Sequence, residues 1–240
     1  MSHYSKQRPE SIQEMFGSIA DRYDFTNAVL SCQLHRWWNA TLIKALQNKN
    51  PHSPLLDLCC GTGEIAFTYL RKAKTSQHVF MLDFCEEMLA CAQHKASNLS
   101  LTQHRLDFIQ ADAQEIPMPD DSVANISMAY GIRNVKNPAL CLAEAYRVLK
   151  PGGWIGILEL TEPENPFLKM GHRMYTGSIL PIVGKWVTSN EQAYSYLCNS
   201  IRSFVKPKEL EMVMKDAGFQ ANEIRPLTGG VATLLLGQKI

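Results

Sequence analysis

The chain has 240 residues, of which 45% are hydrophobic and 20% charged, and its formal net charge is +1. This length supports one buried core, or one core with an inserted cap, and the balanced charge gives no reason to expect nucleic-acid binding. No apolar run approaches the ~20 residues of a membrane span, and residues 1–10 carry no signal-peptide core, so we expect a cytoplasmic protein. The seven cysteines contain no C-x-x-C pair, and we expect no metal site.

Residues 1–50 form a predicted N-terminal helical segment, because apolar side chains within 11–47 recur at helical spacing. The short apolar run at 55–59 is typical of a buried parallel strand. Strands and helices then alternate. Strands are predicted at 79–82, 108–109, 123–128 and 154–160, and helices at 86–96 and 138–149. This alternation predicts a doubly wound α/β fold with a parallel sheet.

The alternation stops after residue 160. Residues 161–206 are predicted to form helices carrying aromatic side chains, followed by a helix at 207–217 and closing strands at 219–225 and 231–239. An insertion after the fifth strand lies at the carboxyl ends of the strands, where ligands of open α/β sheets bind. We therefore expect one domain over 1–240: a helical segment (1–50), a cofactor-binding half (51–160), a helical substrate cap (161–206), and a closing helix and strands (207–240).

A glycine-containing loop follows the first predicted strand. Gly61 and Gly63 permit a tight turn and close approach of the backbone to a ligand. Asp83 ends the next strand, where it can accept hydrogen bonds from ribose hydroxyls. Gly61, Gly63 and Ala66 with Asp83 also fit a dinucleotide fingerprint, so a dehydrogenase is the first rival interpretation.

Three features favour a methyltransferase over a dehydrogenase. Asp57 lies inside the first strand, where it can orient the loop near a cationic methionine group, whereas dinucleotide folds have an apolar strand there. Asp112 follows the third strand and offers an acceptor to an adenine amino group, although a solvated turn is its simpler interpretation. Finally, two further strands end the chain, without a second catalytic domain for hydride transfer.

Longer motifs carry a specific resemblance. Residues 23–38 (YDFTNAVLSCQLHRWW), 131–135 (GIRNV) and 147–161 (RVLKPGGWIGILELT) resemble segments of the ubiquinone/menaquinone C-methyltransferase family. Thr26 stands where the first of these motifs usually has Met. The resemblance covers about residue 15 to the end, and the first motif is the most selective part.

The resemblance implies a seven-stranded class I, Rossmann-like fold and S-adenosylmethionine as cofactor. The reaction it implies is methylation of a ring carbon of a polyprenyl quinol, with demethylmenaquinol favoured over a benzoquinol. Carried over by position, the resemblance adds four cofactor-binding residues to Asp57, Gly61, Gly63 and Asp83. They are Thr62, Asp112, Ala113 and Ala129. The family usually has Asn at 112 and Ser at 129, so any side-chain hydrogen bond at Ala129 is lost.

Four residues are candidates for the chemistry. Arg133 follows the fourth strand and can stabilise a quinolate, and Asn134 can orient the second oxygen. His35 is a candidate base, and Tyr196, with Tyr194, can close the pocket. Each has a simpler alternative. Arg133 can instead form a structural ion pair with Asp24 or Glu159. His35 can be a structural histidine, which is the more common case. At least one of Tyr194 and Tyr196 is expected to pack against the protein rather than face the pocket.

The partners expected from this sequence are a prenylated quinol and a transient contact with the inner membrane surface, and a homodimer is left open. An apolar stripe at Phe167, Met170, Met174, Leu180 and Ile182 is a candidate prenyl channel, with core packing as its alternative. Two other functions are considered: a methyltransferase acting on another small molecule, such as a phenol or sterol oxygen, and a non-catalytic cofactor-binding subunit. The motif at 23–38 argues against the former, and the intact loop with Asp83 and Arg133 against the latter.

Overall fold

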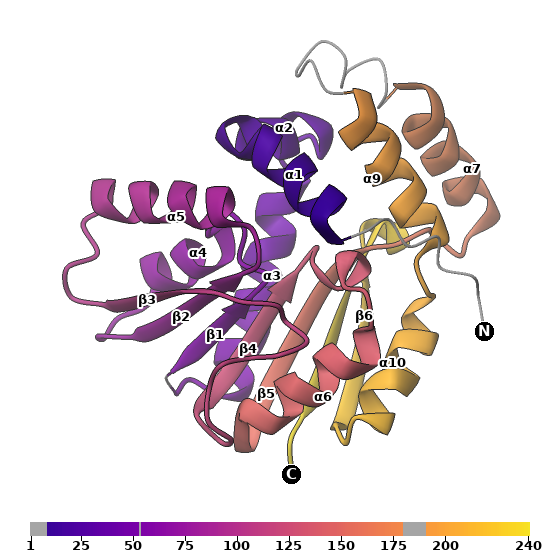
Figure 1. Ribbon diagram of the computed structural model, residues 1–240. Helices are drawn as coiled ribbons and strands as arrows, with labels where there is room; N and C mark the ends of the chain where they lie inside the picture. The colour runs from indigo at the N-terminus through magenta and orange to yellow at the C-terminus, as the bar shows by residue number, and fades with distance from the viewer. Residues whose placement is uncertain (1–8, 53, 180–190) are drawn as a thin grey trace.

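The computed structural model describes residues 9–52, 54–179 and 191–240. These residues form one seven-stranded sheet with strand order β3-β2-β1-β4-β5-β7-β6 (Figure 1). Its strands are β1 (Leu55–Leu58), β2 (His78–Asp83), β3 (Arg105–Gln110), β4 (Val123–Ala129), β5 (Leu149–Leu160), β6 (Gln220–Leu227) and β7 (Ala232–Gln238). Strands β1 to β5 are parallel, and β7 runs antiparallel between β5 and β6. The predicted doubly wound α/β fold is confirmed.

Helices cover both faces of the sheet, which buries the central strands from either side. One face packs against α3 (Leu34–Lys49), α4 (Glu64–Lys72) and α5 (Glu86–Asn98), and the other against α6 (Pro138–Val148) and α10 (Pro207–Asp216). All four residues of β1 are buried, and Leu42 and Leu46 of α3 are among the side chains that cover the sheet. Two-sided burial explains why β1 is an apolar run rather than an alternating one.

The N-terminal segment is divided into separate helices. It contains α1 (Pro9–Ile19), a 3₁₀ turn η1 (Ala20–Arg22), α2 (Tyr23–Leu30) and then α3. The prediction of helix throughout 11–47 is wrong at the α2–α3 junction. There Cys32 and Gln33 have φ angles of 48° and 67°, in the left-handed region that ends a right-handed helix. This break lets α1 and α2 lie over the carboxyl ends of the parallel strands.

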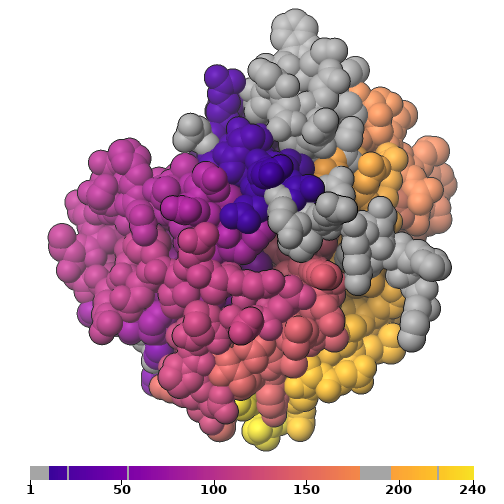
Figure 2. Space-filling view, in the orientation of Figure 1, coloured from indigo at the N-terminus to yellow at the C-terminus, as the bar shows by residue number. Residues whose placement is uncertain are grey.

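The segment after β5 contributes α7 (Pro166–Met174), a π-helical turn η3 (Tyr175–Ile179) and α9 (Glu191–Ser203). Asn165 begins α7 by accepting hydrogen bonds from the backbone N–H groups of Phe167 and Leu168. The Tyr175 hydroxyl donates to the Leu30 carbonyl at 2.6 Å and so joins this segment to α2. In Figure 2, α1 (indigo) lies on the surface between the region of α5 and β3 (magenta) and these helices (orange). Within the described residues, no helix has the length and hydropathy needed to cross a bilayer.

Candidate functional site

Two adjoining cavities lie at the carboxyl edge of the sheet. The first, the sheet-edge cavity, holds about 790 Å³ of space, part of it open to solvent, and is lined by Gly61, Asp83, Phe84, Met88, Asp112 and Ala113 among others. The second, the helical cavity, holds about 1460 Å³, also partly open, and is lined by Thr26, His35, Trp38, Arg133, His172 and Tyr196 among others. Six residues line both cavities: Phe16, Tyr23, Cys59, Gly61, Ala129 and Tyr130. Ligands in the two cavities would therefore meet at this shared wall.

The loop between β1 and α4 depends on its two glycines. Gly61 has φ +52°, and a Cβ built on it meets no atom within 4 Å, so its backbone faces open space. Gly63 has φ +84°, and a Cβ there would lie 2.5 Å from Cε of Met81. Gly63 lines neither cavity. It is required by the turn and by packing, whereas Gly61 leaves room at the cavity wall.

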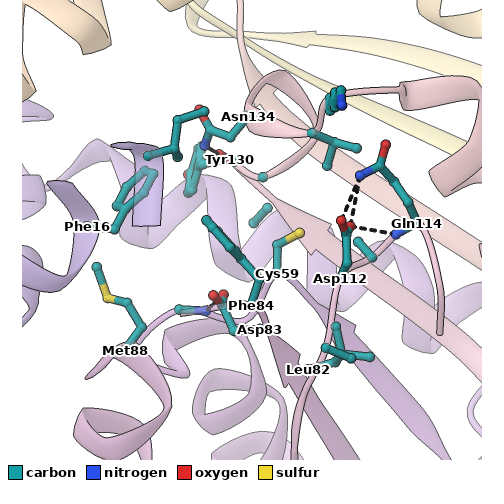
Figure 3. Close-up of a pocket in the computed structure, with 18 of the residues that line it drawn as sticks. Phe16, Cys59, Leu82, Asp83, Phe84, Met88, Asp112, Gln114, Tyr130 and Asn134 are labelled. Carbon is teal, nitrogen blue, oxygen red and sulfur yellow. Dashed lines mark hydrogen bonds between the residues drawn. The ribbon is translucent and has the colours of Figure 1, made fainter. Parts of the chain in front are cut away.

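Asp83 ends β2 and faces the sheet-edge cavity (Figure 3). One carboxylate oxygen accepts a hydrogen bond from the Gly61 N–H at 2.7 Å, and the other accepts from the Cys85 N–H at 3.0 Å. Burial raises the pKa of Asp83, and these backbone donors act in the opposite direction. The side chain is therefore held in one orientation by the loop that it supports.

Asp57 lies beneath this loop and lines neither cavity. Its carboxylate accepts from the Ser127 hydroxyl at 2.8 Å and from the Ala66 N–H at 3.1 Å, in the first turn of α4. Burial raises the pKa of Asp57 to about 7. The prediction that Asp57 orients the loop near the cofactor stays a prediction, and its oxygens hold α4 against the sheet.

Thr62 is also engaged within the protein. Its hydroxyl donates to a carboxylate oxygen of Asp24 at 2.5 Å, and Lys95 binds the other oxygen of Asp24. Thr62 lines the helical cavity and is 2% exposed. The structure thus places the predicted loop residue on the wall of the helical cavity, tied to α2.

The remaining predicted cofactor positions line the sheet-edge cavity. Asp112 is exposed and accepts hydrogen bonds from the Gln114 backbone and side chain (Figure 3). Ala113 is buried beside it, and Ala129 lies on the wall common to both cavities. Asp112 can accept from a ligand amine only if it shares the oxygens that Gln114 uses.

Arg133 lies in the 3₁₀ turn η2 (Ile132–Asn134) and lines the helical cavity. Its Nη1 donates to the Tyr130 carbonyl at 2.8 Å and forms an ion pair with Glu159, whose side chain is fully buried. Of the two alternative partners, the structure selects Glu159, and Asp24 binds Thr62 and Lys95 instead. Burial opposes the charge on Arg133, but Glu159 beside it holds the pKa of the guanidinium above its usual value. The cavity wall therefore carries a guanidinium whose charge is balanced by the buried Glu159 carboxylate.

Asn134 and Tyr196 form one hydrogen-bonded pair. The Tyr196 hydroxyl donates to Oδ1 of Asn134 at 2.9 Å, and Nδ2 of Asn134 donates to the Tyr130 carbonyl at 3.2 Å. The pair joins α9 to η2, with Tyr196 lining the helical cavity and Asn134 the sheet-edge cavity. Burial raises the pKa of Tyr196, so it remains protonated at neutral pH and acts as a donor. The side chain of Tyr194 lies outside the described residues.

His35 has partners on both ring nitrogens. Nδ1 lies 2.7 Å from the Ser31 hydroxyl oxygen, and Nε2 lies 3.4 Å from Oε1 of Glu64. Because the Ser31 hydroxyl also donates to the Asn27 carbonyl at 2.6 Å, it accepts from Nδ1–H of His35. A base role would require a substrate to replace Glu64 at Nε2. That role stays a prediction, and the observed contacts favour a positioning role.

The predicted prenyl channel is wrong where the structure describes it. Phe167, Met170 and Met174 are 81%, 67% and 66% exposed and do not line either cavity. They share the outer side of α7, whereas His172 points from the other side toward the helical cavity. Leu180 and Ile182 lie outside the described residues.

The motif analysis missed the role of Tyr130, which lines both cavities. Its φ of +59° lies in the left-handed region, which is uncommon for a tyrosine, and its hydroxyl donates to Oδ1 of Asn39 at 3.0 Å. Its carbonyl accepts from both Arg133 and Asn134. The sequence did offer one signal for this role. Tyr130 stands directly before the GIRNV motif, where the chain must turn as it leaves β4.

Comparison with known proteins agrees with this arrangement. The chain matches the model of the ubiE/COQ5 methyltransferase family over residues 2–239. It is 50% identical to a demethylmenaquinone methyltransferase of Protochlamydia amoebophila, covering 100% of this chain and 99% of the relative. It is also 38% identical to the ubiquinone/menaquinone biosynthesis C-methyltransferase UbiE of Rickettsia akari, covering 95% of this chain and 92% of the relative.

Solved structures share the fold at low sequence identity. A SAM-dependent methyltransferase from Thermotoga maritima superposes with a TM-score of 0.64 and 18% identity, covering 95% of this chain and 99% of the other. One from Aquifex aeolicus gives 0.57 and 19%, covering 78% and 81%. Given the full-length match to the family model, the sequence relatives and this shared fold, the chain belongs to the ubiE/COQ5 methyltransferase family.

Proposed function

We propose that the protein transfers the methyl group of S-adenosylmethionine to a ring carbon of a prenylated quinol. Demethylmenaquinol is the favoured substrate, because the relative at 50% identity bears the name demethylmenaquinone methyltransferase. The observation that carries the proposal is the wall shared by the two cavities, formed by Phe16, Tyr23, Cys59, Gly61, Ala129 and Tyr130. A methyl donor in one cavity and an apolar acceptor in the other can approach each other there.

The sheet-edge cavity fits the cofactor. Gly61 presents backbone to open space that a Cβ would fill, and Asp83 is placed at the end of β2 to accept from ribose hydroxyls. Ala113 and the buried Met88 offer apolar surface to an adenine ring, with Asp112 at its edge. When bound, the cofactor supplies an electrophilic sulfonium methyl group. The residues of the chain hold it and direct the methyl group toward the shared wall.

The helical cavity fits the quinol ring. A phenolic hydroxyl has a pKa near ~10, and shifting it to ~7 requires about 4 kcal/mol of preferential stabilisation of the phenolate. Arg133, with its charge balanced by Glu159, supplies a guanidinium donor in a dry wall for this purpose. Tyr196 of α9 lines the same cavity and bonds to Asn134 of η2, which lines the sheet-edge cavity. We propose that α7 and α9 act as the substrate cap of a single methyltransferase domain.

We also propose that the outer side of α7 contacts the membrane surface. Phe167, Met170 and Met174 are exposed there, on a helix whose other side lines the substrate cavity through His172. A prenyl tail resides in the bilayer, so a helix that rests on the lipid surface would bring the cavity to its substrate. The variant Phe167→Ser/Met170→Ser should reduce co-sedimentation with vesicles of bacterial polar lipids. Met212→Ser, at a 55% exposed methionine on α10, is the matched control.

The defining experiment for the reaction uses purified protein, labelled S-adenosylmethionine and reduced substrates. Demethylmenaquinol, a demethylated benzoquinol, a simple phenol and a sterol are each offered, and the products are identified by mass spectrometry. We expect ring C-methylation of the quinols, fastest with demethylmenaquinol. Methyl transfer to oxygen of the phenol or sterol would reassign the substrate class. Cofactor binding without turnover of any of them would reject the enzymatic proposal.

A further inference from the structure

The proposed reaction releases one proton inside the helical cavity. The methyl donor is positively charged at sulfur, its product is a neutral thioether, and the methyl group replaces a hydrogen on the quinol ring. Charge and atoms balance only if that hydrogen leaves as a proton. The reaction therefore needs a proton acceptor beside the ring carbon, and carboxylates and neutral imidazoles are the side chains best suited to this role at neutral pH.

Glu64 is the only carboxylate among the described residues that line the helical cavity. Arg133 in the same lining is a cation and cannot accept a proton. Burial raises the pKa of every cysteine thiol and tyrosine hydroxyl in the lining, so these groups stay protonated: Cys59, Cys60, Tyr23, Tyr130, Tyr175 and Tyr196. Burial also lowers the pKa of His172, which weakens it as a base. The acceptors that remain in the described lining are Glu64 and His35.

Glu64 is placed between the cofactor loop and the substrate cavity. It is the first residue of α4, directly after Gly63, and its side chain is 28% exposed. Its Oε1 lies 3.4 Å from Nε2 of His35, whereas Oε2 has no hydrogen-bond or ion-pair partner among the described residues. Burial raises the pKa of Tyr130, and the Glu64 carboxylate is among the nearby charges that raise it further. Glu64 therefore lies close to the wall at which the two cavities meet.

His35 is placed behind Glu64. Its side chain is 6% exposed, against 28% for Glu64, so a ligand in the cavity reaches the carboxylate first. Nδ1–H of His35 donates to the Ser31 hydroxyl, which itself donates to the Asn27 carbonyl. In the uncharged ring, Nε2 therefore carries a lone pair toward Oε1 of Glu64, and neither atom holds a proton. A proton accepted by Glu64 can be shared with His35, which makes His35 a positioning residue.

We infer that Glu64 is the catalytic base that removes the ring proton. This inference rests on the proposed quinol substrate and adds the residue that completes the reaction. The ring carbon forms a bond to the methyl group while the C–S bond breaks, and the electron pair of that bond stays on sulfur. The C–H bond of the same ring carbon then breaks. Its proton moves to Oε2 of Glu64, and its electron pair returns to the ring, which becomes aromatic again.

The test uses demethylmenaquinol with either hydrogen or deuterium on the ring carbon that accepts the methyl group. The wild type should show little isotope effect on kcat, because Glu64 removes the proton faster than the methyl group is transferred. Glu64→Gln keeps the shape of the side chain and should lower kcat by ~10²-fold or more. Turnover of this variant should be slower with deuterium than with hydrogen. Its kcat/KM should fall less, because methyl transfer is irreversible and precedes the slowed step. Glu64→Asp should recover part of the rate.

Glu86→Gln is the matched control, because Glu86 is the first residue of α5, is exposed and lines neither cavity. It also removes a negative charge from a helix N-terminus, and it should leave kcat and the isotope effect unchanged. A Glu64→Gln variant with near-normal kcat would overturn the inference. A variant that is slowed without an isotope effect, or that loses melting temperature and S-adenosylhomocysteine affinity in proportion to activity, would assign Glu64 a structural role instead. Failure of the wild type to methylate any quinol would overturn the proposed function first.

Discussion

The sheet-edge cavity and the helical cavity differ in how their polar groups are partnered. In the former, Asp83 is held by two backbone N–H groups and Asp112 by Gln114. In the latter, Thr26 Oγ1, His172 Nδ1 and Arg133 Nε are buried without a partner. The first cavity is thus prepared by the backbone turns of the sheet, and a ligand adds to existing hydrogen bonds. The second is lined mainly by side chains of helices, which can change without altering the sheet.

The largest effect that separates the cavities is expected at Arg133. Arg133→Leu should lower kcat by ~10²-fold or more, because the interaction with the quinolate grows in the transition state. Affinity for the cationic cofactor should change little. The single variant also leaves Glu159 buried without its partner, a loss of ~3–5 kcal/mol of stability in comparable cases. Steady-state kinetics and thermal melting separate these two consequences.

The double variant Arg133→Leu/Glu159→Gln is the control for stability. The introduced amide would be neutral and would still accept from the Leu160 N–H, so the melting temperature should recover toward that of the wild type. Turnover should stay low, and raising the pH should rescue it partly, because solvent then supplies more quinolate. A double variant that melts normally and keeps near-normal kcat would show that Arg133 is purely structural.

The two loop glycines should fail in different ways. Both have positive φ, so an alanine at either costs ~1–2 kcal/mol of backbone strain. Gly63→Ala also forces Cβ to within 2.5 Å of Met81, and we expect the greater loss of melting temperature there. Gly61→Ala places its methyl group in open space at the cavity wall, so the main loss should be in S-adenosylhomocysteine affinity, roughly tenfold or more. Equal effects of the two variants on affinity and on melting would remove Gly61 from the cofactor wall.

The sequence predicted the sheet-edge cavity better than the helical cavity. The loop glycines, Asp83 and the alternation of strands and helices follow local rules, because tight turns and the carboxyl ends of parallel strands are visible as patterns. The helical cavity does not follow from such rules. Its walls combine α2, η2 and α7, and whether Thr26 or His172 is paired depends on contacts between elements distant in sequence. For the same reason, an apolar stripe such as that of α7 did not reveal whether it faced the cavity or solvent.

Beneath the sheet-edge cavity, Asp57 should make stability depend on pH. Its pKa is about 7 in the folded protein, above the 3.8 of an unperturbed aspartate, so the folded state favours the protonated form. This contribution is fully present below the unfolded pKa and is lost as the pH rises to about 7. From about pH 5 to about pH 8 the wild type should lose roughly 2 kcal/mol more than Asp57→Asn. Denaturant unfolding at both pH values measures this difference, and parallel pH profiles for the two proteins would exclude Asp57 as its source.

The smallest expected effect is at Tyr196, which belongs to the cap side of the helical cavity. Tyr196→Phe removes the hydroxyl that donates to Asn134, a net hydrogen bond of ~1 kcal/mol, so kcat/KM for a long-tailed quinol should fall roughly fivefold. If the pair only fastens α9 to η2, the change lies in KM, because closure of the cap is weakened while the chemistry at Arg133 is intact. A contact made only in the transition state would instead lower kcat at unchanged KM. Tyr175→Phe serves as the comparison, because the Tyr175 hydroxyl joins the cap to α2 through the Leu30 carbonyl. If both variants raise KM, the effect comes from weaker closure of the cap. If only Tyr196→Phe changes, and the change is in kcat, the Tyr196 hydroxyl contacts the reacting quinol.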